Sequence, residues 1–483
     1  MPGERRMFIG GEWVASQGGA AMEATAPATG EVIGSVPEGT RADVGLAVEA
    51  ARRASAPWSS ASAFDRAAAM RRIATVIDSR RESLARTLTL DQGKPLEAEA
   101  RDEVNELILF FDMASADATR AEGLIAPSVD AGRRVLLYRV PRGVVGVISP
   151  WNWPYTMPAE IVAPALAFGN TVVLTPAPST SLCAVALAQC IGEADLPPGA
   201  FNLVTGQGPV VGDELAGHGG VAAVGFIGSI ATGHGVAGRA AGKDVLLEMG
   251  GNGPLVVCDD ADLDAAVQGT IEACFLNAGQ SCTAGERILL QRDVHDEFVA
   301  KLIAAGADHV RLGDPFDPDT TMGPLNNAGV ADKTERHVEE AAAQGAAVVA
   351  GGKRAPRHGS DLFFEPTVVD GVTEGMQIAR EETFGPVVPI TTIGSEQDAI
   401  EIVDQSPYGL MSAIFTRDLA RGLRFAERVR TGSVNINDGT NYWESHLPFG
   451  GRAGSASGVG RVGGRFSIDR LTELKTIVVS LGE

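Results

Sequence analysis

One cysteine of the chain, Cys282, lies in a loop built largely of small residues, from Asn277 to Arg287. An apolar, helix-like run from 265 to 275 precedes the loop, and a strand-like run from 288 to 290 follows it. Small neighbours would let a carbonyl compound approach the sulfur closely, and a thiolate held there would be a nucleophile. A lone cysteine is more often an inert core thiol, so this interpretation depends on partner residues elsewhere in the chain.

Two polar side chains are candidate partners, because each follows a short apolar run that is typical of a buried strand. Asn152 follows the run 144–148 within a Pro-Trp-Asn-Trp-Pro segment, and Glu248 follows the run 245–247 and precedes two glycines. An amide N–H could stabilise the oxyanion formed when a thiolate adds to a carbonyl group, and a carboxylate could activate water. The alternatives are a turn residue for Asn152 and a helix cap or salt bridge for Glu248.

A third apolar run, 221–226, is followed by Gly228 and Ser229 at the start of helix-like sequence. Glycine at the turn and exposed backbone N–H groups at a helix N-terminus suit a pyrophosphate. The segment 206–212 also looks like a glycine fingerprint, but its spacing differs from GxGxxG and Pro209 lacks a backbone donor. We therefore assign the phosphate role to Gly228 and Ser229, and interpret 206–212 as the start of a helix.

The elements that must position these residues follow from the alternation of strand-like and helix-like runs. Between residues 144 and 250 this alternation predicts a parallel, doubly wound sheet. The carboxyl ends of its strands would lie along one edge, where ligands bind, so the loops with Asn152, Ser229 and Glu248 would meet there. A second alternation of the same kind runs from about 253 to 445.

Helices and edge strands complete the prediction. Helical periodicity predicts one helix over 41–55, a second over 64–90 and a third that has Pro95 in its first turn. The alternating stretch 123–142 predicts a projecting hairpin, and the strand-like run 475–481 comes last. Such edge strands could pair between subunits.

Composition bounds the class of protein. A chain of 483 residues predicts two or three domains, and a net charge of −21 argues against nucleic acid and anionic membranes as partners. Five cysteines without a CxxC pair argue against a disulfide framework and favour the cytoplasm, and seven scattered histidines indicate no metal site. We expect neither a signal peptide nor a membrane span, since the most apolar stretch, 161–174, is broken by Pro164 and Gly169.

Six short motifs occur in the same order as in the NAD(P)-dependent aldehyde dehydrogenase superfamily, which the chain resembles over nearly its whole length. Each motif alone is weak, but six in order are very specific. They are Pro150-Trp151-Asn152-Trp153-Pro154, Gly228-Ser229, Glu248-Met249-Gly250-Gly251, Gly279-Gln280-Ser281-Cys282, Glu381-Glu382-Thr383-Phe384-Gly385-Pro386 and Pro448-Phe449-Gly450-Gly451.

The resemblance implies a role for each matching residue. Cys282 would be the nucleophile, Glu248 the general base, and Asn152 would form the oxyanion hole with the backbone N–H of Cys282. The reaction implied is NAD(P)⁺-dependent oxidation of an aldehyde to the carboxylic acid through a thiohemiacetal and a thioester. The cofactor contacts would be Gly228 and Ser229 at the pyrophosphate, Glu382 at the nicotinamide ribose, Phe384 beside the nicotinamide, and also Thr175 and Trp151.

The resemblance also implies an α/β fold of three parts. A doubly wound, Rossmann-like cofactor domain would comprise 1–122 and 143–250, and an α/β catalytic domain would comprise 251–445. A small β oligomerisation domain would be made of 123–142 and 465–483. Members of the superfamily form dimers or tetramers through that small sheet, so we expect a homodimer or homotetramer.

The chain departs from the family pattern at several positions. Thr175-Pro176-Ala177-Pro178 replaces a Lys-Pro-Ser-Glu-like segment whose Lys and Glu bind adenosine ribose hydroxyls. Without the acid, the repulsion of the 2′-phosphate of NADP is lost, and without the lysine the attraction of that phosphate is lost as well. We expect NAD as the cofactor, with NADP as the alternative. Ile161 and Val462 replace a Lys and a Glu that resemble a proton relay near the base, so a proton on Glu248 would need another route. The loop 450–458 is two residues longer than usual.

The aldehyde tunnel, by the same resemblance, is lined from the 150 loop and from the loop before Pro448. Two tryptophans and a carboxylate could surround a cation there, and no arginine lies in either stretch to clamp a carboxylate-bearing semialdehyde. The betaine-aldehyde and aminoaldehyde members of the family resemble this in part, with aromatic boxes at the positions of Trp153 and Trp443 but usually an aromatic residue at the position of Glu160. The alternative is an ordinary apolar tunnel with Glu160 in a salt bridge elsewhere. The residues concerned are Trp153, Tyr155, Thr156, Glu160, Trp443, Glu444 and Phe449.

Two other functions are compatible with this pattern. One is CoA-dependent acyl transfer from the same thioester, as in a CoA-acylating semialdehyde dehydrogenase, and the other is a binding or structural protein with a relic site. Glu248 argues against the first, because a thiol acceptor needs no water-activating base. The intact set of Cys282, Asn152 and Glu248 argues against the second. The expected partner is a small aldehyde.

Overall fold

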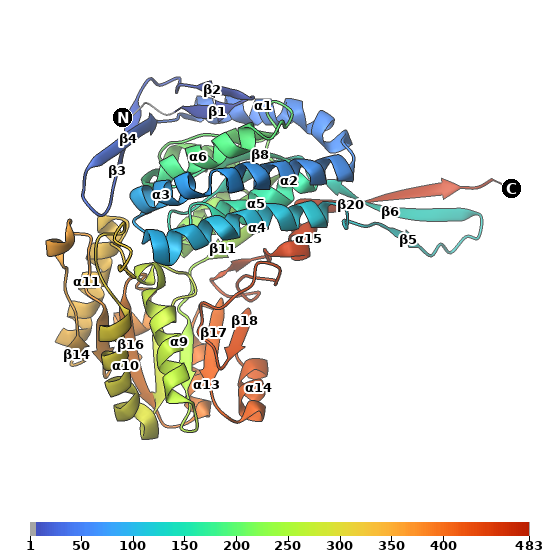
Figure 1. Ribbon diagram of the computed structural model, residues 1–483. Coiled ribbons are helices and arrows are strands. Elements are labelled where there is room, and N and C mark those ends of the chain that lie inside the picture. The colour runs from blue at the N-terminus through green and yellow to red at the C-terminus, as the bar shows by residue number, and fades with distance from the viewer. Residues whose placement is uncertain (1–5, 483) are drawn as a thin grey trace.

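The computed structural model describes residues 6–482 of the chain (Figure 1). Two helix-covered sheets form the upper and lower parts of the molecule in this view, and a thin arm of strands extends to one side. The predicted alternation of strands and helices is therefore present in both halves. None of the described helices is long and apolar enough to cross a membrane.

The first sheet has the strand order β19-β11-β10-β7-β8-β9-β1-β2. Its five central strands are parallel, as predicted, and antiparallel strands close both edges. The central strands are β7 (Val144–Ile148), β8 (Thr171–Thr175), β9 (Phe201–Leu203), β10 (Ala223–Gly228) and β11 (Asp244–Met249), and the edge strands are β1 (Met7–Ile9), β2 (Glu12–Val14) and β19 (Gly458–Val459).

The helices of the first half differ from the prediction in two places. The single helix expected over 64–90 is two helices that meet at Arg80, where α2 ends and α3 begins. α2 packs mainly on α4, whereas α3 packs on both α4 and α6. Pro95 precedes a π-helical turn (Leu96–Ala100) instead of lying in the first turn of α4. The helices are α1 (Arg41–Ser60), α2 (Ala63–Ser79), α3 (Arg81–Gln92), α4 (Arg101–Ala118), α5 (Thr156–Ala167), α6 (Ser181–Gly192), α7 (Gly208–Gly217) and α8 (Ile230–Arg239).

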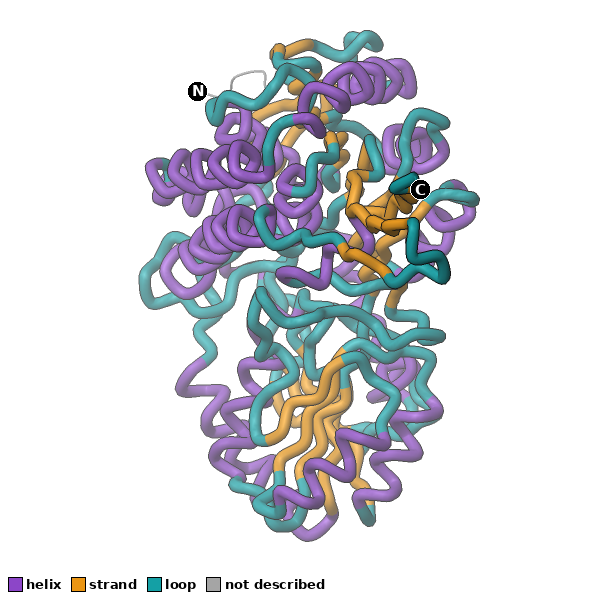
Figure 2. The backbone as a smooth tube through the Cα atoms, turned by 90° about the vertical axis from the view of Figure 1, so that its right-hand side faces the viewer, coloured by secondary structure: helices purple, strands orange, loops and turns teal. Residues whose placement is uncertain are grey.

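The second sheet has the order β14-β15-β16-β13-β12-β17-β18 and is parallel except at β14, and Figure 2 shows helices on both of its faces. Its strands are β12 (Pro254–Val257), β13 (Arg287–Gln291), β14 (Ala347–Ala350), β15 (Thr367–Asp370), β16 (Val387–Ile393), β17 (Met411–Phe415) and β18 (Ser433–Ile436). Its helices are α9 (Leu263–Phe275), α10 (His295–His309), α11 (Ala328–Ala343), α12 (Gln377–Arg380), α13 (Glu396–Gln405) and α14 (Leu419–Arg428).

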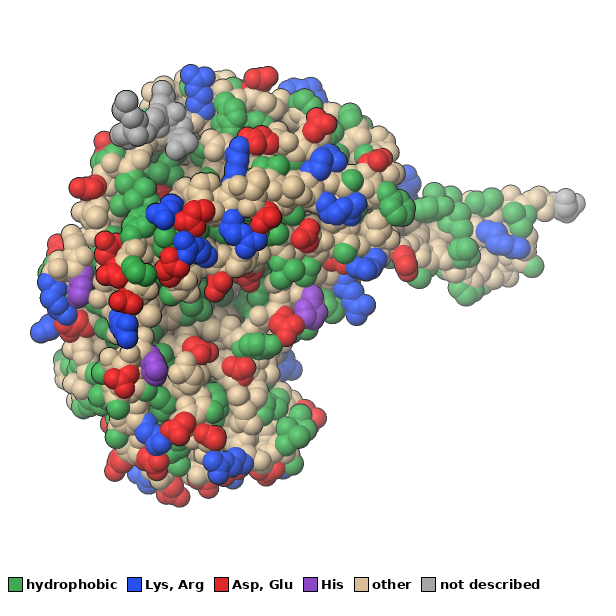
Figure 3. Space-filling model, in the orientation of Figure 1, with side chains coloured by type: hydrophobic (Ala, Val, Ile, Leu, Met, Phe, Trp, Pro, Cys, Tyr) green, Lys and Arg blue, Asp and Glu red, His purple; other side chains and the backbone are tan. Residues whose placement is uncertain are grey.

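The arm is the predicted hairpin joined by the last strand. β6 (Arg133–Pro141) pairs antiparallel with β5 (Leu124–Ala126) on one side and with β20 (Thr472–Ser480), which follows α15 (Ile468–Leu471), on the other. Hydrophobic side chains gather along the arm in Figure 3, and Ile125 is 76% exposed. A separate hairpin of β3 (Ala21–Thr25) and β4 (Val32–Pro37) was not predicted.

Candidate active site

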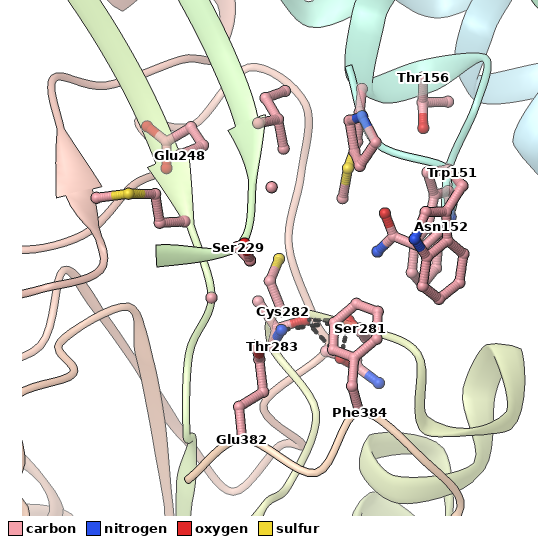
Figure 4. Close-up of a pocket in the computed structure, with 18 of the residues that line it drawn as sticks. Trp151, Asn152, Thr156, Ser229, Glu248, Ser281, Cys282, Thr283, Glu382 and Phe384 are labelled. Carbon is pink, nitrogen blue, oxygen red and sulfur yellow. Dashed lines mark hydrogen bonds between the residues drawn. The ribbon is translucent and has the colours of Figure 1, made fainter. Parts of the chain in front are cut away.

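Most residues predicted to act together line one cavity of about 410 Å³ (Figure 4). The loops after β7, β10 and β11 contribute from the first sheet, and the loop between α9 and β13 contributes from the second. The predicted site residues that line it are Trp151, Asn152, Trp153, Thr156, Glu160, Gly228, Ser229, Glu248, Cys282, Glu382, Phe384, Trp443 and Phe449.

Three residues singled out in the sequence lie outside this lining. Thr175 is buried at the carboxyl end of β8, and its hydroxyl lies 3.5 Å from the Val147 carbonyl oxygen. Tyr155 is fully buried in the core, where its hydroxyl donates to the Leu84 carbonyl. Glu444 lines an adjoining cavity instead.

A tight turn aims Cys282 at the cavity. Asn277, Ala278 and Gly279 have consecutive positive φ angles of 51°, 53° and 74°, and for an alanine this conformation costs about 1–2 kcal/mol. A Cβ on Gly279 would lie 2.1 Å from the Gly385 carbonyl oxygen, so only glycine fits there. The Asn277 amide donates to the Asn152 carbonyl at 2.9 Å, which ties this turn to the Asn152 loop.

The Asn152 side chain is held beside this turn. It is 3% exposed, and its Nδ2 donates to the Gln280 carbonyl oxygen at 3.0 Å. Figure 4 shows its amide on the side of the cavity that faces Cys282. The second N–H of the same amide group is therefore the donor that an oxyanion on a Cys282 adduct would use.

Glu248 lies in β11 near its carboxyl end and is 4% exposed, and neither of its oxygens accepts a hydrogen bond from a residue within 6–482. The 450–458 loop wraps it: a Cβ on Gly450 would lie 2.5 Å from Glu248 Oε1, and Ser457 accepts from Met249 N at 3.0 Å. Burial raises the pKa of Glu248 well above its ordinary value, and the Glu160 carboxylate adds to this while Arg461 opposes it. A carboxylate of raised pKa is a stronger base once ionised.

The Cys282 thiol lies among carboxylates. Burial raises its pKa above the ordinary value, and Glu382, Glu160 and Glu248 add to the effect. The thiolate therefore needs nearby positive charge, which an oxidised nicotinamide ring would supply when bound.

Several features fit a nicotinamide nucleotide. Ser229 caps α8 and lines the cavity beside Gly228, so the N-terminus of that helix begins at the cavity edge. Glu382 Oε1 accepts from Gly251 N at 3.1 Å, and a Cβ on Gly250 would lie 2.5 Å from the same oxygen. Burial, with a contribution from Glu286, raises the pKa of Glu382 to about 8. A ribose hydroxyl would satisfy this carboxylate.

Phe384 and Trp151 supply an aromatic wall. Their ring centroids are 5.5 Å apart in an edge-to-face arrangement, and Phe384 has a φ of 63°. Glu286 holds this conformation, because its carboxylate accepts from Thr383 N at 2.6 Å and from Phe384 N at 2.7 Å. The donors, the carboxylate and the aromatic wall match the three parts of such a cofactor.

The part of the cavity predicted to bind the substrate has more charged residues around it than the sequence indicated. Lys94 Nζ lies 3.7 Å from the centre of the Trp153 ring and pairs with Glu103 at 2.6 Å, with both charged side chains 1% exposed. One face of Trp153 is thus already occupied by a cation of the protein. Trp443 contacts Phe110 and Phe449, with ring centroids 6.2 Å and 5.2 Å away.

Glu160 makes no salt bridge within residues 6–482, which contradicts the alternative that it pairs elsewhere. It lines the cavity together with Glu106, and burial and Glu106 raise its pKa well above the ordinary value. The cavity lining holds no arginine, and its one lysine, Lys333, lies near Phe384 on the cofactor side.

Sequence reasoning missed the residues that support this site. Asn277 and Glu286 lie in the Cys282 stretch, but nothing in their spacing indicated a partner. Glu106 lies in a segment interpreted as a helix packing on a core, and Lys94 lies in the break between two such helices. The one available signal was charge placed on the side of α4 that carries apolar residues.

Comparison with known proteins identifies the family. A sequence profile described as "Aldehyde dehydrogenase family" matches residues 13–477. A 3-sulfolactaldehyde dehydrogenase of Pseudomonas putida is 39% identical, covering 98% of this chain and 96% of that protein. A succinate-semialdehyde dehydrogenase [NADP(+)] of Escherichia coli strain K12 is 38% identical, covering 99% and 98%.

The fold agrees as well. The crystal structure of a betaine aldehyde dehydrogenase from Staphylococcus aureus in complex with NAD⁺ matches with a TM-score of 0.96 at 36% identity, covering 99% of this chain and 95% of that one. The predicted α/β fold class is confirmed by this match. The chain belongs to the aldehyde dehydrogenase family and is an oxidoreductase that oxidises aldehydes with NAD or NADP.

Proposed function

We propose that oxidation proceeds through a covalent adduct on Cys282. The sulfur adds to the aldehyde carbon, and the new oxyanion is held by Asn152 Nδ2 and the Cys282 backbone N–H. The bound oxidised cofactor supplies the hydride acceptor, which leaves a thioester on Cys282. Glu248 then takes a proton from water as the water oxygen attacks, the C–S bond breaks, and the carboxylic acid leaves.

The observation that carries this proposal is the convergence of Cys282, Asn152 and an unpaired, buried Glu248 in one cavity. CoA-dependent acyl transfer would not need a base placed there, and a relic site would have no reason to keep a buried carboxylate without a partner, since burial of such a group is costly. We therefore favour hydrolytic release of the acid.

We further propose the division of the chain expected above, with cofactor residues 1–122 and 143–250, catalytic residues 251–445 and an oligomerisation arm of 123–142 and 465–483. The separate sheets of the two halves support it. NAD is the cofactor we favour, since no lysine replaces the missing one near Thr175. Localisation in the cytoplasm fits five free cysteines.

We propose a homodimer or homotetramer assembled through the arm. Its apolar side chains are largely uncovered in one chain, including Leu124, Ile125, Leu474 and Val478. An exposed apolar edge of this kind is typical of a surface that pairs with another strand or subunit.

Replacing Asn152 with alanine is expected to lower kcat by about 10²–10³-fold, because one oxyanion donor is lost. The measurement is steady-state kinetics, with cofactor affinity as a check that the Gln280 contact is not needed for folding. Unchanged kcat with a raised KM would mean that Asn152 only positions the substrate.

The charges around the cavity favour a substrate without a carboxylate. Glu106 and Glu160 line it, and no arginine does. A carboxylate-bearing aldehyde would add negative charge beside two buried carboxyl groups in a partly dehydrated site, whereas an ammonium group would be attracted to them and would favour their ionised form. We propose that the preferred aldehyde is neutral or cationic, in contrast to the anionic substrates named for two of the relatives.

A panel of aldehydes of equal chain length tests the function and the substrate together. The members end in a methyl, an ammonium or a carboxylate group, and each is assayed with NAD or NADP and with or without CoA. We expect free acid whether or not CoA is present, and kcat/KM in the order ammonium, methyl, carboxylate. Acyl-CoA as product would contradict hydrolytic release, and preference for the carboxylate would contradict the charge argument.

A further inference from the structure

Hydrolysis leaves a proton on Glu248 that must reach solvent in every turnover. The side chain is buried, and its oxygens have no hydrogen-bond partner within residues 6–482. Ile161 and Val462 are both 0% exposed and belong to the apolar core, so they offer no acceptor. Arg461 is near enough to oppose the rise in the pKa of Glu248. A guanidinium group stays protonated at neutral pH, however, so it cannot accept the proton.

Two carboxylates in the same cavity have no part in the covalent steps. Glu160 on α5 and Glu106 on α4 both line the cavity that holds Glu248 and Cys282. The helices α4 and α5 pack against each other, which places the two carboxylates on facing elements.

Glu106 also opens to the outside. It lines a second cavity of about 630 Å³, together with Lys94, Glu103 and the exposed Asp102. Trp153, Leu276, Trp443 and Glu106 line both cavities, and Glu106 is the titratable group among these shared residues. A proton that reaches Glu106 has access to water.

The electrostatic couplings follow the same order as the geometry. Besides burial, Glu160 is the carboxylate that raises the pKa of Glu248, and Glu106 is the one that raises the pKa of Glu160. Burial, Glu103 and Asp102 raise the pKa of Glu106 to about 7, with Lys94 opposing. Each carboxyl group thus interacts electrostatically with the next, from Glu248 through Glu160 to Glu106.

We propose that Glu160 and Glu106 conduct the proton from Glu248 to the outer cavity, with water molecules bridging the carboxyl groups. Glu248 gives its proton to Glu160, Glu160 passes one to Glu106, and Glu106 releases one to solvent. Only O–H bonds break and form, and no oxidant or reductant is needed. The proposal rests on the role of Glu248 as base, and it takes over the task that a Lys and Glu pair would have at Ile161 and Val462.

The test uses a neutral aldehyde, so that attraction of a charged substrate plays no part. In Glu160→Gln we expect the first burst of reduced nicotinamide to be kept and the later steady state to fall by about 10–10²-fold, less than loss of the base itself. Imidazole or formate, added as a small proton carrier, should restore part of that rate in proportion to its concentration. Glu106→Gln should show the same pattern with a smaller loss.

Two further variants distinguish a role of Glu160 in proton transfer from a purely structural role. Glu160→Asp keeps an acid and should keep most of the steady-state rate, while Asp112→Asn removes an exposed charge of α4 outside both cavities and should change nothing. Loss of the burst in Glu160→Gln, an unchanged steady state, or a loss that small acids do not relieve would each overturn the proposal. Full turnover in Glu248→Gln would instead contradict the proposed function.

Discussion

Replacing Cys282 with alanine is expected to abolish aldehyde oxidation and to leave the fold and the cofactor affinity nearly unchanged. In the proposed mechanism the covalent adduct forms on this sulfur, so without it neither the hydride step nor the hydrolysis would begin. Alanine also removes little volume from a turn that is held by Asn277 and Gly279 rather than by the thiol. Turnover and cofactor binding by titration are the two measurements.

The other cysteines provide the control. Cys183, Cys190, Cys258 and Cys274 are buried, whereas Cys282 is partly exposed to the cavity. Cys190→Ala should therefore keep its activity, and a thiol-alkylating reagent should label Cys282 first and inactivate the enzyme in proportion to that labelling. More than a few per cent activity in Cys282→Ala would remove it as the nucleophile.

Replacing Glu248 with glutamine should slow hydrolysis of the thioester more than hydride transfer. Loss of a general base costs about 10²–10⁴-fold, so a pre-steady-state burst of reduced nicotinamide should precede a slow steady state. Rapid mixing with aldehyde and cofactor measures both phases. If the burst disappeared together with turnover, Glu248 would be acting before the hydride step.

The environment of Glu248 sets two further expectations for this experiment. Neither carboxylate oxygen has a hydrogen-bond partner within residues 6–482, so the amide should fold in its place, as thermal unfolding can check. Burial raises the pKa of Glu248, and the base is active when ionised. In the unmodified enzyme the hydrolysis rate should therefore rise with pH, and do so at a higher pH than an ordinary glutamate would give. The variant should lack that rise.

Local patterns predicted the framework of the site well. Apolar runs of three to six residues predicted β7, β10 and β11, and residues in the segments that follow these runs line the cavity. A parallel strand buried on both faces leaves this signature in one short window of sequence, so the loops that follow such strands can be recognised without knowing their neighbours. The hairpin of the arm was recognisable because the alternation of residue types along 123–142 is also a local pattern.

Packing between distant segments was not predictable in that way. Helical periodicity continues through Arg80, but Arg80 has φ −113° and ψ 9°, so the chain turns there, and α2 packs mainly on α4 whereas α3 packs on both α4 and α6. Tyr155 lies next to cavity residues in sequence, yet its side chain is fully buried in the core, where its hydroxyl donates a hydrogen bond to the Leu84 carbonyl oxygen. Which side of a short segment is covered depends on elements far away in the chain.

The sequence by itself determined the two mainly parallel sheets and the projecting edge strands, and it singled out Cys282, Asn152 and Glu248 as the proposed catalytic residues, because strand periodicity and six ordered motifs are local properties of the chain. Only the tertiary structure decided which charges meet in the cavity. Glu106, Glu160 and Glu248 come from α4, α5 and β11, and Lys94 covers Trp153 from another segment. Burial and proximity set the pKa of each carboxylate, and both arise only when these elements pack together.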